Sequence, residues 1–311
     1  MEMNNPSAAT ANTAWLEERF LLYGSVTLPV GTLYVNDIVN VPPVMSCGRV
    51  KTAGAGGYYI APHATLSGKQ TKIVQLESCP LFRVQGVGFI MEEPVQLEGD
   101  GTSACFEIEG RQATGIASGR HHFRNLCLYN WTKAFDCLAG YYNTSEVFVP
   151  DENHADNSSV TNCEFFNVGT LFHSTNQQAL NWYFKKCVWN QIGEWTPSII
   201  ADIVRGGCIT FDELVVNATY VTLFRTEQYS PNNARLVSKN MFIDRIITDE
   251  EDQYFKVLDY NGTPETASFK DWFIDVEGWS AVYFDPASFI DAPLDLPQTH
   301  FNIDIKTKYT S

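Results

Sequence analysis

Asp212 and Asp244 are the two carboxylates whose positions in the sequence best suit acid–base chemistry. Each directly follows an apolar residue, Phe211 or Ile243, in a pattern that recurs along the chain. If these apolar residues occupy equivalent places on neighbouring parallel strands, the two carboxylates stack about 4.8 Å apart. Cleavage of a glycosidic bond uses two carboxyl groups roughly 5 to 9.5 Å apart. Asp212 and Asp244, with Glu213 beside them, are therefore the predicted catalytic residues.

A second interpretation of the same charges is a surface in which stacked side chains neutralise one another. Lys185 and Lys270 flank the two aspartates, and the positions one residue further along alternate in sign. These alternating positions are Lys186, Glu213, Arg245 and Asp271. Opposite charges on adjacent strands stabilise a sheet mildly. A sequence selected only for stacking would show this pattern too, so both interpretations stay open.

Several aromatic residues fall outside the predicted inward positions and are expected on the surface. They are Tyr129, Trp131, Tyr141, Tyr142, Trp182 and Trp195. Exposed aromatic rings stack on sugars and also fill subunit interfaces. These residues are therefore candidates for glycan binding or for an interface. The outward cations Arg124 and Lys185 could contact the same glycan or serve as a base in a lyase reaction.

The other candidate motifs predict no cofactor and no metal. The eight cysteines are scattered without CxxC spacing, and the six histidines lack the i, i+4 pairing of helical zinc sites. The glycine-rich segment 54–57 lacks a following Lys-Ser or Lys-Thr, which favours a tight turn over a phosphate site. The acidic segments 151–156 and 249–252 lack the ligand spacing of a calcium loop.

Charge and hydropathy exclude further classes of partner. A net charge of −15 disfavours nucleic acid and anionic membranes, because duplexes are bound chiefly through Lys and Arg contacts with phosphates. No stretch approaches the roughly 20 apolar residues needed to cross a bilayer, so no membrane insertion is expected. The N-terminus has no basic region followed by an apolar one, which predicts synthesis in a cytoplasm without a signal peptide.

A repeated sequence pattern must position all of these side chains. Its apolar anchors are Phe123, Val160, Phe184, Phe211, Ile243 and Phe269. A strand alternates faces at every residue, so the apolar residues three and five positions after each anchor require a bend between them. The bends are predicted at Asn125, Asn162, Lys186, Glu213, Arg245 and Asp271. Stacked coils of about 20 to 30 residues are typical of a parallel β-helix, and we predict an all-β solenoid.

Three segments follow from this pattern. Residues 1–24 are predicted to be a flexible arm followed by a helix at 13–23, which ends at Gly24 and either caps the solenoid or attaches it to an assembly. Residues 25–278 form the β-helix. The Pro-rich residues 279–311 are predicted to be a C-terminal cap or a trimerisation segment.

The run from Cys79 to Asn217 resembles the pectate-lyase-like right-handed β-helix superfamily. The segments 81–89 (LFRVQGVGF) and 159–169 (SVTNCEFFNVG) carry the resemblance, and in character they are closest to the tailspike proteins of bacterial viruses. The resemblance implies a right-handed, single-stranded helix. It further implies a homotrimeric virion protein that binds host surface polysaccharide and contacts other virion proteins through its N-terminal segment.

Catalysis does not follow from this resemblance. The polygalacturonase set of Asn-Thr-Asp, Asp-Asp, Gly-His-Gly and Arg-Ile-Lys and the Arg-x-Pro-x-x-Arg of pectate lyases are missing from the sequence. Fold alone leaves activity open. Three functions are therefore considered: a glycan-binding spike, a polysaccharide hydrolase or lyase on the same scaffold, and a purely architectural capsid or tail subunit.

Overall fold

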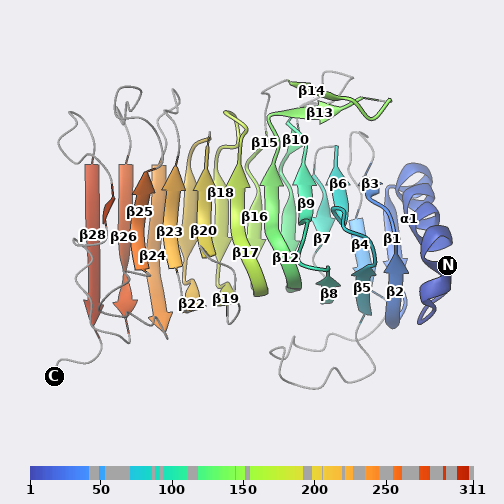
Figure 1. The fold of residues 1–311 in the computed structure, drawn as a ribbon, viewed down its shortest axis with the longest axis horizontal. Helices are drawn as coiled ribbons and strands as arrows, with labels where there is room; N and C mark the ends of the chain where they lie inside the picture. Colours follow the sequence, from blue (N-terminus) through green and yellow to red (C-terminus); the bar gives the residue numbers. More distant parts are fainter. Residues whose placement is uncertain are drawn as a thin grey trace.

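The fold is that of a computed structural model of the 311-residue chain. It describes all residues outside 42–48, 53–70, 86–87, 92–93, 111–117, 144, 151–154, 192–197, 205, 219–220, 227–234, 245–254, 261–272, 281–289, 292–299 and 308–311. Strands stack side by side along one long axis, with the N-terminal helix at one end and β28 at the other (Figure 1). This is the predicted all-β parallel β-helix. The strand pairings do not test its right-handed winding, which stays a prediction.

The main sheet consists of three parallel ladders, one for each face of the coil. Ladder A holds the anchor residues of the repeated sequence pattern. Its strands are β1 (Ser25–Leu28), β4 (Arg49–Thr52), β7 (Ile90–Met91), β11 (His122–Arg124), β16 (Ser159–Thr161), β18 (Trp182–Lys185), β21 (Ile209–Asp212), and the first parts of β24 (Arg235–Asp244), β26 (Phe273–Ser280) and β28 (His300–Thr307).

Ladders B and C follow in each coil. Ladder B contains β2 (Gly31–Val35), β5 (Thr71–Gln75), β8 (Val95–Glu98), the first parts of β12 (Leu126–Cys137) and β17 (Glu164–Ser174), β19 (Val188–Gln191), β22 (Val215–Ala218), and the second parts of β24, β26 and β28. Ladder C contains β3 (Val39–Val41), β6 (Phe82–Val84), β9 (Ala104–Ile108), the second parts of β12 and β17, β20 (Ser198–Ile203), β23 (Val221–Thr226), β25 (Phe255–Tyr260) and β27 (Ile290–Asp291).

Two small pairings lie outside the ladders. β10 (Ser118–Gly119) pairs in parallel with β15 (Ala155–Asp156), and β13 (Gly140–Tyr142) forms an antiparallel hairpin with β14 (Phe148–Pro150). The hairpin leaves ladder C at the end of β12 and lies beside β9 and β6 (Figure 1).

Inward side chains from the three ladders fill the space between them with stacked rings. Phe106 and Phe135 lie on neighbouring strands of ladder C with ring centroids 5.3 Å apart, and Phe184 and Phe211 on ladder A are 4.8 Å apart. All four side chains are buried. Burying such a side chain contributes about 1.5 to 3 kcal/mol, so each coil is held mainly by the coils on either side of it.

The N-terminal helix covers one end of this core. Capping the solenoid was one of the two roles predicted for it. Helix α1 runs from Ala9 to Tyr23, after a 3-10 turn at Pro6–Ala8, and therefore begins four residues before the predicted start at Thr13. Leu16 and Phe20 are buried against the first coil. Gly24 takes the left-handed conformation (φ 60°) and its N–H bonds to the carbonyl of Phe20, so the helix ends where predicted.

One detail of the predicted N-terminal segment is wrong. The predicted flexible arm is ordered: Asn12 Nδ2 donates to the carbonyls of Glu2 and Tyr34, and Asn4 Oδ1 accepts from the N–H of Thr32. Leu21 is 65% exposed because the helix presents Leu16 and Phe20 to the core. Among the described residues, no helix is long and apolar enough to span a membrane.

Residues in the left-handed region form the corners between ladders A and B. The predicted bends Asn125, Asn162, Lys186 and Glu213 have φ between 52° and 59°. Asparagine tolerates this conformation better than other residues with a side chain. In the next coil this corner is at Asn240 (φ 52°), and the predicted bends at Arg245 and Asp271 lie outside the described residues.

The predicted pairing is wrong at the fifth anchor, Ile243, for one reason. Ser238, not Ile243, pairs with the anchor Phe211, and Ile243 pairs with Val216 on ladder B. The buried Ser238 hydroxyl donates to the sulfur of Met241, which allows a polar residue at an inward position. The pattern of apolar anchors therefore does not identify Ser238.

The C-terminal strands continue the coils. β26 spans the predicted boundary at residue 278, and β28 pairs with it over its full length. Residues 279–280 and 300–307 therefore belong to the solenoid, and a trimerisation role for 279–311 stays a prediction.

Replacing a corner asparagine tests the conformational argument. We expect Asn162→Ala to lower the free energy of unfolding by about 1 kcal/mol, because alanine has no polar side chain to offset the left-handed backbone. Asn162→Gly should change it by less than about 0.5 kcal/mol. Urea unfolding followed by circular dichroism measures both, and equal stabilities for the alanine variant and the parent would contradict the argument.

Candidate functional site

The predicted pair Asp212 and Asp244 does not stack. Asp212 pairs with Lys239 in ladder A, whereas Asp244 pairs with Asn217 in ladder B. The two carboxylates lie on different faces of the coil because the corner at Asn240 comes between them. The prediction that they face each other is wrong.

Asp212 instead sits among donors from its own ladder. The Tyr183 hydroxyl donates to it at 2.7 Å, Asn240 Nδ2 donates at 3.2 Å, and Lys185 Nζ lies 3.6 Å away. The hydrogen bond from Tyr183 is the largest cause that lowers the pKa of Asp212. At the next position Glu213 lies 3.9 Å from Lys186, with both side chains about half exposed. These contacts support the compensated-surface interpretation of Asp212 and Glu213.

Two predicted surface tryptophans belong to the core. Trp131 and Trp182 are buried, and their indole N–H groups donate to the carbonyls of Leu97 and Ala155. Trp131 follows a second left-handed corner at Asn130, which resets the alternation of faces. Neither tryptophan can bind a glycan or a partner without unfolding its coil.

The remaining predicted contact residues lie on the surface or are not among the described residues. Tyr129 faces outward on ladder B and stacks on Phe166 at 5.2 Å. Arg124 is exposed on ladder A beside Thr161. Trp195 lies outside the described residues, as do the glycine-rich segment 54–57 and the acidic segment 249–252.

A row of charged residues on ladder C was missed by the sequence analysis. In the register of the sheet these residues lie side by side on successive strands and point outward. We call them the charged column: Arg83, Glu107, Asp136, His173, Asp202, Arg225 and Asp259. Their neighbours Phe135, Phe172 and Phe224 face the core. The backbones of adjacent members, which lie on neighbouring strands, are therefore about 4.8 Å apart.

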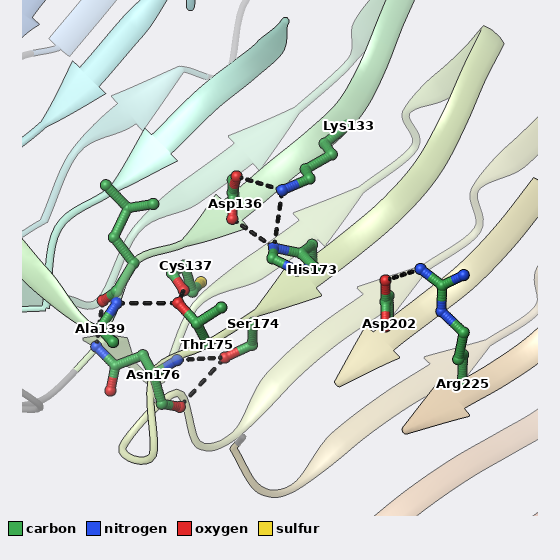
Figure 2. A network of polar contacts seen from close by, with 11 residues as sticks. Lys133, Asp136, Cys137, Ala139, His173, Ser174, Thr175, Asn176, Asp202 and Arg225 are labelled. Carbon is green, nitrogen blue, oxygen red and sulfur yellow. Dashed lines mark hydrogen bonds and ion pairs between the residues drawn. The ribbon is translucent and has the colours of Figure 1, made fainter. Parts of the chain in front are cut away.

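Asp136 has a polar contact at each of its two carboxylate oxygens. Lys133 Nζ donates to Asp136 Oδ2 at 2.7 Å, and His173 Nδ1 lies 2.6 Å from Asp136 Oδ1 (Figure 2). Lys133 Nζ also lies 3.1 Å from His173 Nδ1, so the three side chains form one network of polar contacts. Burial would raise the pKa of Asp136, but the hydrogen bond and charge of His173 and the charge of Lys133 outweigh burial and lower it.

Glu107, on the next strand, has the opposite shift. Burial raises the pKa of Glu107, and the charge of Asp136 raises it further, against the lowering effect of Arg83. Arg83 Nε donates to Glu107 Oε2 at 3.1 Å. Two carboxyl groups on adjacent strands with pKa values shifted apart form a recognised acid and base arrangement.

On the other side of His173 the column continues with an ion pair. Arg225 bonds to Asp202 Oδ2, and both residues come from ladder C (Figure 2). Asp202 Oδ1 is buried and has no hydrogen-bond partner in the described part of the chain. Further along, Lys256 donates to Asp259 at 3.1 Å.

The hairpin β13–β14 packs against the other end of the column. Arg83 Nη1 bonds to Glu146 of the hairpin at 2.7 Å, and its guanidinium lies 3.9 Å from the centre of the Tyr142 ring. Glu109 accepts the N–H of Tyr142 at 2.9 Å and an amide N–H of Gln85 at 3.3 Å. Glu109 is buried beneath the hairpin.

Glu109 gives the fold a measurable pH dependence. Burial raises the pKa of Glu109 from 4.5 to about 7. Between these values the folded chain keeps a proton that the unfolded chain has released, so the free energy of unfolding falls as pH rises. The shift corresponds to a loss on the order of 3 kcal/mol between pH 4.5 and 7.

Urea unfolding of the parent and of Glu109→Gln at pH 5 and pH 8 checks this. The parent should lose more stability than the variant between the two pH values, because glutamine does not titrate. Glu77→Gln, which changes a carboxylate outside the column, is the control and should follow the parent. An equal loss in parent and Glu109→Gln would contradict the assignment.

The sequence did hold a signal for the charged column. A triplet recurs on ladder C, in which an apolar residue comes first and a charged residue or His comes second. The triplets are FRV (82–84), FEI (106–108), FDC (135–137), FHS (172–174), ADI (201–203) and FRT (224–226). The distance from each ladder A anchor to this triplet varies with the corner between ladders B and C. A search at fixed spacing from the anchors therefore does not find it.

The comparisons with known proteins return few matches. No family model matches the chain, and no curated protein matches it. Among solved structures the chain is similar to the catalytic domain of a GH87 alpha-1,3-glucanase in complex with tetrasaccharides, at 11% identity and a TM-score of 0.34, over 100% of this chain and 68% of the other. It is also similar to such a catalytic domain in complex with nigerose, at 10% identity and a TM-score of 0.27, over 100% and 67%.

Proposed function

We propose that the protein hydrolyses a polysaccharide, with Glu107 as the proton donor and Asp136 as the ionised carboxylate. The observation that carries the proposal is the pairing of Glu107 with Asp136 in register on adjacent strands, with pKa values shifted in opposite directions. Both side chains keep some exposure, at 15% and 11%. A sugar ring lying along ladder C would contact both.

The roles follow from the contacts. Glu107 carries a proton to higher pH than an ordinary glutamate and would donate it to the glycosidic oxygen as the bond breaks. Asp136, held ionised by His173 and Lys133, would form the bond to the anomeric carbon. Water would then release the sugar, with the deprotonated Glu107 accepting a proton from the water.

The spacing predicts the stereochemical outcome. Adjacent strands place the backbones of the two residues about 4.8 Å apart. Side chains that leave the same face of the sheet side by side suit the roughly 5 to 5.5 Å between carboxyl groups of enzymes that retain the anomeric configuration. We therefore expect the first-formed product to keep the configuration of the substrate. Proton NMR of the anomeric signal in the first minutes of the reaction tests this, and an inverted product would exclude Asp136 as the nucleophile.

Charge favours a neutral substrate. The chain carries a net charge of −15, and the cations of the site are already paired with its own carboxylates Glu107, Asp136 and Asp202. Polysaccharides rich in uronic acid would be repelled. Neutral chains such as glucans, mannans or xylans are the expected class.

Incubation with purified polysaccharides tests the function. The protein is mixed with a neutral panel and with polygalacturonate, and oligosaccharide release is followed by size-exclusion chromatography and a reducing-end assay. Release from a neutral polymer, lost in Glu107→Gln, supports the proposal. Binding without shortening of any polymer would overturn it and favour the glycan-binding spike predicted from the resemblance. The virion location, the homotrimer and the attachment through residues 1–24 stay predictions of that resemblance.

A further inference from the structure

An apolar stripe runs along the outside of ladder B in the C-terminal half of the solenoid. Its members are adjacent in the register of the sheet and occupy one outward position on successive strands. We call them the ladder B stripe: Glu164, Val188, Val215, Phe242, Trp279 and Lys306. Outward positions of a sheet that faces water usually carry polar side chains. Four apolar residues in consecutive positions therefore require another explanation.

The stripe is accessible from outside. Val188, Val215 and Phe242 are half-buried, and Trp279 is 52% exposed. Large exposed apolar residues that are contiguous, with polar residues at the rim, mark interaction sites. The position two residues along each strand supplies such a rim with Asn190, Asn217 and Asp244.

The two ends of the stripe carry opposite charges. At one end Glu164 Oε2 is buried and has no hydrogen-bond partner in the described part of the chain. Burial raises the pKa of this carboxyl group. At the other end Lys306 is 59% exposed, with Nζ 5.8 Å from the centre of the Trp279 ring and 3.4 Å from Asp304.

We propose that two copies of the chain associate through the ladder B stripe with their solenoid axes antiparallel. A twofold axis perpendicular to the stripe, between Val215 and Phe242, places Val188 of one copy opposite Trp279 of the other and Glu164 opposite Lys306. The apolar residues then cover one another, and the half-buried Glu164 lies opposite the exposed cation of Lys306. The proposal is independent of the proposed hydrolase activity.

The order of the charges selects the antiparallel arrangement. Two copies with parallel axes would bring Glu164 against Glu164 and Lys306 against Lys306, and like charges at an interface oppose association. An interface with twofold symmetry is self-complementary, so each residue contact occurs twice. The order of acid, four apolar residues and base is complementary to its own reverse, which is the pattern that such an interface requires.

Exchange of the end charges tests the proposal. Gel filtration with light scattering of the full chain at 1 to 50 μM should give the mass of two chains of 34.9 kDa. Lys306→Glu and Glu164→Lys should each raise the dimer dissociation constant by at least tenfold, and the double variant should restore it. Lys239→Glu, an exposed change on ladder A, is the matched control and should leave the dimer intact.

Trp279→Asp provides a test that does not depend on Glu164, and it should give a monomer with an unchanged circular dichroism spectrum. A parent protein that is monomeric at 50 μM, a trimeric mass, or a double variant that remains dissociated while folded would each overturn the proposal. If the Glu164→Lys chain fails to fold, Lys306→Glu and Trp279→Asp decide the outcome.

Discussion

Asp136→Asn is expected to reduce the rate of polysaccharide cleavage by about a thousandfold or more. The asparagine keeps the shape of the side chain and its contact with Lys133, but it cannot attack the anomeric carbon or stabilise positive charge there. Positioned acid, base and nucleophilic groups typically contribute factors of about 10² to 10⁴ in rate. Initial rates on the neutral polysaccharide that the parent cleaves, measured at saturating substrate, give the effect on kcat.

Asp212→Asn is the matched control for this experiment. Asp212 is also an outward aspartate that accepts hydrogen bonds and lies near a lysine, but it belongs to ladder A, away from the charged column. We expect its activity to stay within about twofold of the parent, a smaller change than loss of even a modest catalytic group. Loss of activity in Asp212→Asn with full activity in Asp136→Asn would move the site to ladder A.

Trp182→Ala is expected to lower the free energy of unfolding by about 3 to 5 kcal/mol, the range for removing a large aromatic side chain from a core. The Trp182 ring lies 5.1 Å from Phe172 and 5.7 Å from Phe135, and its indole N–H bonds to the carbonyl of Ala155 at 2.7 Å. The substitution removes these contacts and leaves a buried carbonyl without its donor. Urea unfolding of parent and variant measures the change.

Leu22→Ala is the control, because Leu22 is 59% exposed on the capping helix and should change stability by less than about 0.5 kcal/mol. The same experiment separates the two roles considered for Trp182. A residue that binds glycan would lose affinity with little change in stability. A variant as stable as the parent but deficient in polysaccharide binding would contradict the core assignment.

Local rules explain why much of the fold was predictable. The strand alternation around Phe123, Val160, Phe184 and Phe211 predicted their common position in ladder A, and the sheet register confirms it. The corner at Asn162 and the helix end at Gly24 depend on the conformational preference of one residue. Such preferences can be read without knowing what lies on the neighbouring coil.

The predicted register failed where a polar residue occupies an inward position. Ser238 occupies an anchor position because Met241 accepts its hydroxyl, and this moved Asp244 away from Asp212. The outcome for Trp182 has a different origin: it lies two residues before the anchor Phe184 on the same strand, so strict alternation places both side chains on the inward face.

The charged column shows the same limit for the candidate site. Asp136 and His173 follow their anchors Phe123 and Val160 at equal distances, but Asp202 lies further from its anchor Phe184. The corners between ladders B and C differ in length, so residues that are adjacent in space have no constant spacing in the sequence. The pKa shifts arise from burial and from these cross-strand neighbours.

The sequence by itself determined the all-β coiled architecture, the capping helix and most of the corners between ladders A and B, because each depends on alternation or on the backbone preference of single residues. Only the tertiary structure decided which carboxylates face one another. A one-residue change in corner length moves a side chain to a different strand or face, and stacking between coils sets the final register.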